Sequence, residues 1–89
     1  MQRAQKNNLV INLKTTILLI TCDIHKNIDV ANTIQKISGV KEAIPVNGSY
    51  DCIVKTEELS PDDVKNLVLY SIRPLDYVRN VLTLQNASS

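Results

Sequence analysis

The sequence predicts an α+β domain with the element order strand, helix, strand, strand, helix, strand. Three observations support this prediction. Four short segments are rich in β-branched and other apolar residues, as strands are. Two longer segments space their apolar residues as one face of a helix does. The pattern of the first half of the chain also recurs in the second half. With 89 residues, the chain has the length of one small domain with a modest core.

The predicted strands span residues 15–22, 41–46, 50–56 and 77–84. The first, TTILLITC, is the clearest because most of its residues are β-branched. Between the second and third strands, Asn47-Gly48-Ser49 predicts a hairpin turn in which Gly48 supplies a positive φ. Upstream, residues 9–13 alternate weakly between apolar and polar, so residues 1–14 form either a tail or an extra strand.

The two predicted helices have start and stop signals as well as an apolar stripe. Asn27 is the expected N-cap of a helix over residues 28–37, and Gly39 fits the left-handed conformation that ends it. The second helix starts at Ser60-Pro61, a cap followed by proline at the first helical position, and Pro74 ends it. The residues expected to be buried are Val30, Ala31, Ile34 and Ile37 in the first helix, and Val64, Leu67, Val68 and either Ser71 or Ile72 in the second.

An internal repeat turns this element order into a specific architecture. Residues 36–46 and 74–84 align without a gap, so that Val40 matches Val78 and Lys41 matches Arg79. Each half is therefore a helix, a tight exit and a strand. Two such halves are typical of the ferredoxin-like βαββαβ plait, in which both helices cover one face of a four-stranded antiparallel sheet.

The other face of the predicted sheet is also apolar. In the first strand Leu18 and Ile20 point to one side, while Ile17 and Leu19 point to the other. Helices can cover only one side, and large apolar patches are rare on soluble monomers. We therefore expect the chain to form a homodimer through the sheet.

Composition excludes several classes of function. Ten basic and nine acidic residues give a net charge of +1, which does not support direct nucleic-acid binding. The longest apolar run, residues 17–20, is too short to span a membrane, and the N-terminus lacks a signal-peptide pattern, so we expect a cytoplasmic location. No cysteine and histidine spacing suggests a metal or cofactor site. The only histidine, His25, lies in a polar loop without an acid–base partner, so no enzymatic activity is expected.

Cys22 and Cys52 fall in strands that are antiparallel neighbours in such a plait. Their sulfurs could therefore lie close together. In a cytoplasmic protein both are expected to stay reduced and buried.

Three segments, ILLITCD, ISGVKEAIPVNGSYDCIVK and VRNVLTL, resemble the C-terminal effector domain of the Lrp/AsnC transcription regulators, often called the RAM domain. The most specific part is G-x-Y-D followed by an apolar strand. The resemblance assigns a RAM-type domain to residues 15–86 and a C-terminal tail to residues 87–89. Because only fourteen residues precede the first strand, the expected form is the stand-alone domain without the helix-turn-helix.

The resemblance implies an oligomeric, effector-binding function in transcription regulation. It implies a dimer built by sheet-face packing, rings of four dimers, and an amino acid or similar small effector bound near the G-x-Y-D loop. A full-length Lrp/AsnC regulator is an implied partner. The effector-binding residues carried over are Gly48, Ser49, Tyr50, Asp51 and Thr83.

Simple chemistry supports part of this assignment. Asp51 can accept the ammonium group of an amino acid, and backbone N–H groups of the glycine-containing turn can receive its carboxylate. Two departures stand out: Thr83 alone remains where relatives carry a threonine-rich run, and Asp76-Tyr77 replaces their usual Pro-Gly. Two alternatives stay open, a purely structural oligomerisation module without ligand and a small ferredoxin-like dimeric enzyme. On the structural alternative, Gly48, Tyr50 and Asp51 serve only the turn.

Overall fold

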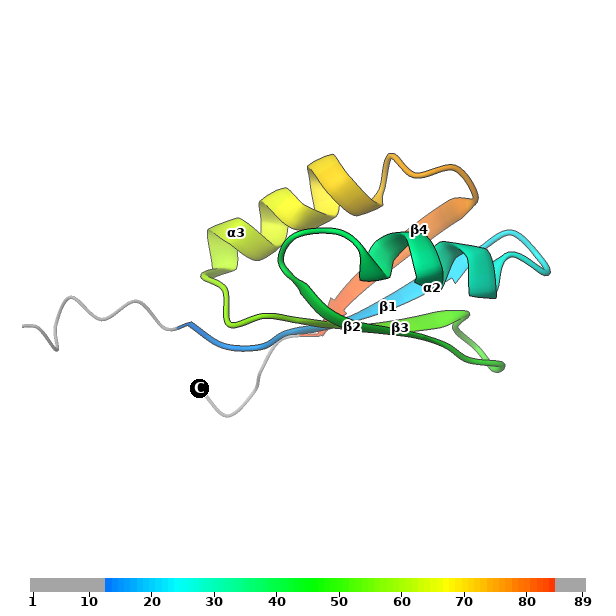
Figure 1. Ribbon diagram of the computed structural model, residues 1–89, viewed down its shortest axis with the longest axis horizontal. Coiled ribbons are helices and arrows are strands. Elements are labelled where there is room, and N and C mark those ends of the chain that lie inside the picture. The colour runs from blue at the N-terminus through cyan, green and yellow to red at the C-terminus, as the bar shows by residue number, and fades with distance from the viewer. Residues whose placement is uncertain (1–12, 85–89) are drawn as a thin grey trace, which may run out of the picture.

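The computed structural model describes residues 13–84, which form a four-stranded sheet covered on one face by helices (Figure 1). In chain order the elements are β1 (Ile17–Cys22), α2 (Asn27–Gln35), β2 (Val40–Pro45), β3 (Cys52–Thr56), α3 (Pro61–Asn66), the π-helical segment η1 (Leu67–Ile72) and β4 (Val78–Leu84). The predicted fold class and element order are confirmed. Most boundaries differ from the prediction by one or two residues.

The sheet has the strand order β2-β3-β1-β4, and all neighbouring strands are antiparallel. The two strands of the internal repeat, β2 and β4, are therefore the outer strands of the sheet. Helix α2 and the α3–η1 helix lie on the same side of this sheet, and the opposite side carries no helix among the described residues (Figure 1). This arrangement is the one that the repeat predicted.

The core lies between the helices and the sheet. Alternate residues of β1 and β3 are buried, which places Leu18, Ile20, Cys52 and Val54 under the helices. The predicted helical stripes are buried too, with Ile72 rather than Ser71 completing the second stripe. Ile37 is partly buried and packs at the edge of the core.

The predicted cap of the first helix is wrong, whereas that of the second is confirmed. Helix α2 includes Asn27, and its N-cap is Lys26, whose side chain makes no capping bond. The Asn27 side chain instead accepts the N–H of Ile28 through Oδ1 at 3.0 Å and donates from Nδ2 to the Val46 carbonyl at 3.1 Å, so it ties the first turn of α2 to the residue after β2. At α3 the Ser60 hydroxyl accepts from the Asp63 backbone N–H at 3.2 Å.

A short bridge before β1 ties the start of the described chain to the connection between β3 and α3. Lys14 pairs with Leu59 in an antiparallel bridge, and Leu13 is exposed. The rest of the segment 1–14, for which a tail or an extra strand was predicted, lies outside the described residues, as does the predicted tail 87–89. Among residues 13–84 no helix is both long and apolar enough to cross a membrane.

Positive φ angles occur at three described residues, and they correct one prediction. Gly39 has φ +97°, as expected for the residue that ends the first helical unit. Gly48 does not have a positive φ, so the predicted reason for glycine in the hairpin is wrong. The non-glycine residues are His25 at φ 65° and Tyr77 at φ 76°. Tyr77 matches Gly39 in the repeat, so both halves keep a left-handed exit although only one supplies glycine.

Replacing the two glycines by alanine separates these roles. We expect Gly39→Ala to lower the free energy of unfolding by about 1–2 kcal/mol, because an L-residue is strained at positive φ. Gly48→Ala is the matched control: no atom lies within 4 Å of the position that its methyl group would occupy, so it should be neutral within about 0.5 kcal/mol. Chemical denaturation of both variants measures the difference, and equal losses would contradict the assignment.

Candidate functional site

The β2–β3 loop, residues 46–51, carries four of the five predicted effector-binding residues. Backbone bonds fix it at both ends: Val46 N–H donates to the Asp51 carbonyl at 2.9 Å, and Asp51 N–H donates to the Ile20 carbonyl at 2.8 Å. The hydrogen bond from the Asn27 side-chain amide to the Val46 carbonyl ties the same loop to α2. Gly48 and Ser49 are exposed, and Tyr50 is half-buried. The loop is thus a firmly anchored platform with an open tip.

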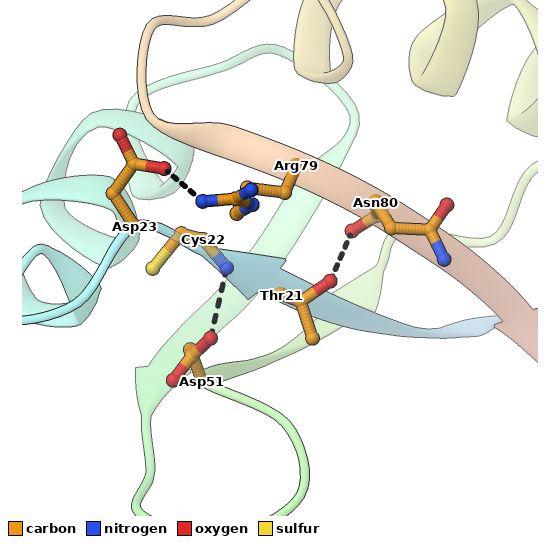
Figure 2. A network of polar contacts seen from close by, with 6 residues as sticks. All are labelled: Thr21, Cys22, Asp23, Asp51, Arg79 and Asn80. Atoms are coloured by element: carbon orange, nitrogen blue, oxygen red, sulfur yellow. Dashed lines mark hydrogen bonds and ion pairs between the residues drawn. The ribbon is translucent and has the colours of Figure 1, made fainter.

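Asp51 joins this loop to the end of β1. Its Oδ2 accepts the backbone N–H of Cys22 at 2.8 Å (Figure 2). The side chain therefore does support the backbone, as the structural alternative expected. A carboxylate has several acceptor sites on its two oxygens, and the Cys22 N–H occupies one of them on Oδ2. The Cys22 thiol also interacts with this carboxylate, which contributes to its raised pKa. Asp51 therefore keeps acceptor capacity for a further donor.

The loop lacks one kind of anion-binding backbone arrangement, the nest formed by successive right-handed and left-handed residues. None of residues 46–51 has a positive φ. That the turn's own N–H groups receive a carboxylate stays a prediction.

Thr83, the fifth predicted residue, lies away from the loop. It pairs with Leu18 on β1, and Leu18 pairs with Val54 on β3. Thr83 is thus level with Val54, which is three residues after Asp51. It lies on β4, two strands away from β3. With ordinary strand spacings this amounts to roughly 10 Å in each direction. One chain alone does not bring Thr83 and Asp51 together.

Cys22 and Cys52 lie under the helices, next to Asp51. Both are buried free thiols, and Cys52 Sγ donates to the Asn27 carbonyl at 3.3 Å. Burial, followed by the neighbouring Cys22 and Asp51, raises the pKa of Cys52 from 9.0 to about 12. Burial and the Asp51 carboxylate also raise the pKa of Cys22. Both groups are therefore neutral thiols at physiological pH.

The two thiols should be unreactive in the folded chain. We expect neither Cys22 nor Cys52 to react quickly with a thiol reagent such as Ellman's reagent at neutral pH, because the thiolate is the nucleophile. Both should react once guanidinium chloride unfolds the chain. Because the folded pKa of Cys52 lies above the unfolded one, its contribution to stability is complete below about pH 9 and is lost as the pH rises towards 12. Rapid labelling of the native chain would show that this end of the sheet opens.

Sequence reasoning missed a group of charged side chains at the same end of β1. Arg79 Nη1 pairs with Asp23 Oδ1 at 3.2 Å (Figure 2), and Lys26 Nζ lies 4.6 Å from the centre of the Tyr77 ring. Arg79 sits in a β-bulge: Cys22 pairs with Val78 and Thr21 pairs with Asn80, which leaves Arg79 as the extra residue. The internal repeat indicates this bulge, because Lys41, which matches Arg79 in the repeat, is likewise the extra residue of a bulge between Val40 and Glu42.

The sheet face without helices carries an apolar row across all four strands. Register places Ile44, Ile53, Leu19 and Leu82 side by side, one from each strand. In this chain Ile44 and Leu82 are both 43% exposed. We call these four residues the apolar row. They confirm that the central strands are apolar on both faces.

Two shallow grooves lie elsewhere, on the helical layer. One of about 240 Å³ is lined by α2 and residues 75–77, and another of about 330 Å³ lies between residues 38–39 and the α3–η1 helix. Neither includes a predicted effector-binding residue. In the described part of the chain no group of three or more histidine, cysteine or acidic residues could hold a metal ion.

Comparison with known proteins gives matches among solved structures only. No protein-family model matches the chain, and no curated protein does. A hypothetical protein from Pyrococcus horikoshii matches with a TM-score of 0.71 and 28% identity, over 79% of this chain and 84% of that one. E. coli AsnC matches with a TM-score of 0.73 and 18% identity, over 97% of this chain and 60% of AsnC. The chain has the fold of the matched part of AsnC.

A second regulator extends the AsnC likeness. The transcriptional regulator NMB0573 from Neisseria meningitidis, solved in complex with L-Met, matches with a TM-score of 0.67 and 14% identity. The match covers 94% of this chain but only 54% of the regulator. The structural neighbours are therefore Lrp/AsnC proteins over most of this chain, which spans little more than half the length of the two regulators. At 18% and 14% identity, the likeness to these two proteins is one of fold.

Proposed function

We propose that this chain is an oligomeric effector-binding domain of the Lrp/AsnC type, the stand-alone RAM domain, which binds an amino acid or a similar small molecule. It acts in transcription regulation in the cytoplasm, by assembling with or modulating full-length regulators. The observation that carries the proposal is the fold shared with AsnC and with a regulator solved in complex with L-Met. The β2–β3 loop of this chain adds support, because the Asp51 side chain anchors it to the backbone of Cys22.

The proposed assembly begins with a homodimer that covers the apolar row. Ile44, Ile53, Leu19 and Leu82 would pack against their counterparts in a second copy, which removes apolar surface from water. Glu42 and Lys55, paired on neighbouring strands beside the row, would form part of a polar rim. Further association, up to four dimers, would use other surfaces.

The proposed ligand site lies at the open tip of the β2–β3 loop. The Asp51 carboxylate would accept an ammonium group, as a charge-assisted hydrogen bond. Open space beside Gly48 lets a ligand approach the loop closely, with Ser49 and Tyr50 beside it. Thr83 would join the site from a neighbouring copy, since it is remote from the loop within one chain. The site would thus be completed by assembly.

A thermal-shift screen with the twenty common L-amino acids tests the proposal. A ligand that binds only the folded chain raises the melting temperature. We expect at least one amino acid to raise the melting temperature. If this amino acid changes the oligomeric state, it should also change the sedimentation profile of the chain. If none of the twenty raises the melting temperature while the chain is oligomeric, the purely structural module is the better description.

A further inference from the structure

We infer that Gln35 closes the outer edge of β2 to a second copy of the chain. Its side-chain amide occupies the backbone groups through which the β2 strands of two copies would otherwise pair edge to edge. Gln35 is thus an autoinhibitory contact that determines which surface of the domain associates. The inference goes beyond the proposed function, because it depends neither on a ligand nor on the apolar row.

The first step is to find which backbone groups of β2 point away from the sheet. Register pairs Ile44 with Ile53 on β3, and two residues later the Val46 N–H donates to the Asp51 carbonyl. Backbone groups alternate between the two edges of a strand. Even-numbered residues in this stretch therefore direct their N–H and C=O groups to β3, and odd-numbered residues, with Ala43 in the middle, direct theirs outwards.

The second step is that Ala43 carries the only regular outward N–H of β2. Lys41 is the extra residue of the bulge, where regular pairing is interrupted. Pro45, at the other end of the strand, has no N–H. In an antiparallel pairing of two copies about a twofold axis, Ala43 would therefore meet its counterpart and exchange two backbone bonds with it.

The third step is that the Gln35 amide already fills this position. Gln35 is the last residue of α2 and is exposed. Its Oε1 accepts the Ala43 N–H at 2.8 Å, and its Nε2 donates to the Lys41 carbonyl at 3.2 Å. One side chain thus supplies an acceptor and a donor to the edge, as a residue of an added strand would.

Concentration decides the competition between Gln35 and a second copy. Unpaired groups at a sheet edge are a template for pairing with another chain. A tethered partner acts at an effective concentration of about millimolar or more, well above a second copy at micromolar concentration. The amide bonds therefore prevail, and the β2 edge stays closed.

Amide hydrogen exchange at Ala43 is the first test. The Ala43 N–H should exchange at least about tenfold faster in Gln35→Ala than in the unmodified chain, because its acceptor is lost. Alanine is a good helix former, so α2 should remain intact. Asn32→Ala is the matched control, at another exposed position of the same helix, and should leave the exchange at Ala43 unchanged.

Association of copies is the second test, made by sedimentation in the Leu82→Glu background so that the apolar row does not contribute. Adding Gln35→Ala to Leu82→Glu should make the chains associate at least about tenfold more tightly, because the Ala43 groups become free to pair. Gln35→Glu in the same background keeps an acceptor for the Ala43 N–H, so it should not strengthen association.

Three results would overturn the inference. Unchanged exchange at Ala43 in Gln35→Ala would show that the amide does not hold the edge in solution. Faster exchange without tighter association would show that Gln35 only links α2 to β2. Association of Gln35→Glu as strong as that of Gln35→Ala would show that occupation of the Ala43 N–H is not what keeps copies apart.

Discussion

The Leu82→Glu variant is expected to sediment as a single chain at micromolar concentrations at which the unmodified chain sediments as a dimer. Leu82 lies on the edge strand β4 and belongs to the apolar row on the face without helices. In one chain it is 43% exposed, so glutamate can stay hydrated there and the fold tolerates it. In a face-to-face dimer the same carboxylate would be buried without a partner, which costs several kcal/mol. We expect the dimer dissociation constant to rise by at least about 100-fold.

Tyr70→Glu is the control for this change. Tyr70 is 75% exposed on the α3–η1 helix. This helix covers the face of the sheet opposite to the one that carries the apolar row (Figure 1). The Tyr70→Glu substitution introduces the same charge as Leu82→Glu but should leave the dimer intact. Circular dichroism confirms that both variants are folded. A Leu82→Glu variant that remains dimeric would show that the copies pair through another surface, and a monomeric unmodified chain would remove the assembly altogether.

Removing the Asp51 side chain should have the second large effect, on both stability and binding. Asp51→Ala leaves the backbone N–H of Cys22 without its acceptor at 2.8 Å. The expected loss in the free energy of unfolding is about 1–3 kcal/mol. Every amino-acid-induced shift in melting temperature should also disappear, because the proposed ammonium acceptor is gone.

Asp51→Asn separates the two roles of this side chain. Its amide oxygen can still accept from Cys22, so the loss of stability should be below about 1 kcal/mol. The negative charge is absent, so the amino-acid-induced shift should be lost as in the alanine variant. Denaturation in urea gives the stability, and the thermal-shift screen gives the binding. A normal shift in Asp51→Asn would mean that the carboxylate serves only the backbone.

The elements that sequence predicted well are those whose signals are periodic. Alternation in residues 17–20 placed Leu18 and Ile20 in the core and left Ile17 and Leu19 on the other face, because strand geometry alone fixes this pattern. Helical spacing likewise identified Val30, Ala31 and Ile34 as buried. The repeat then supplied the topology, since two equivalent halves leave few arrangements.

The elements that sequence missed depend on contacts between distant residues. Asn27 is a residue type that favours the N-cap position, but here its side-chain amide donates a hydrogen bond to the carbonyl of Val46, 19 residues further along the chain. The switch from α3 to π-helical geometry at Leu67 carries no spacing signal, because the same apolar stripe suits both forms. Of the candidate site, the loop and the bond-forming capacity of Asp51 were predictable. The ion pair between Arg79 and Asp23 was not, because it requires the register between β1 and β4.

The paired bulges also bear on how far copies of this chain can associate. Strands β2 and β4 are the two outer strands of the sheet. The unpaired N–H and C=O groups of an unprotected outer strand can pair with the edge strand of another chain, and repeated pairing of this kind leads to aggregation. Each begins with a bulge that carries a basic side chain, Lys41 or Arg79, and β2 ends at Pro45, which has no N–H to donate. These features disfavour growth in the plane of the sheet, so the proposed association would use the apolar row and not the strand edges.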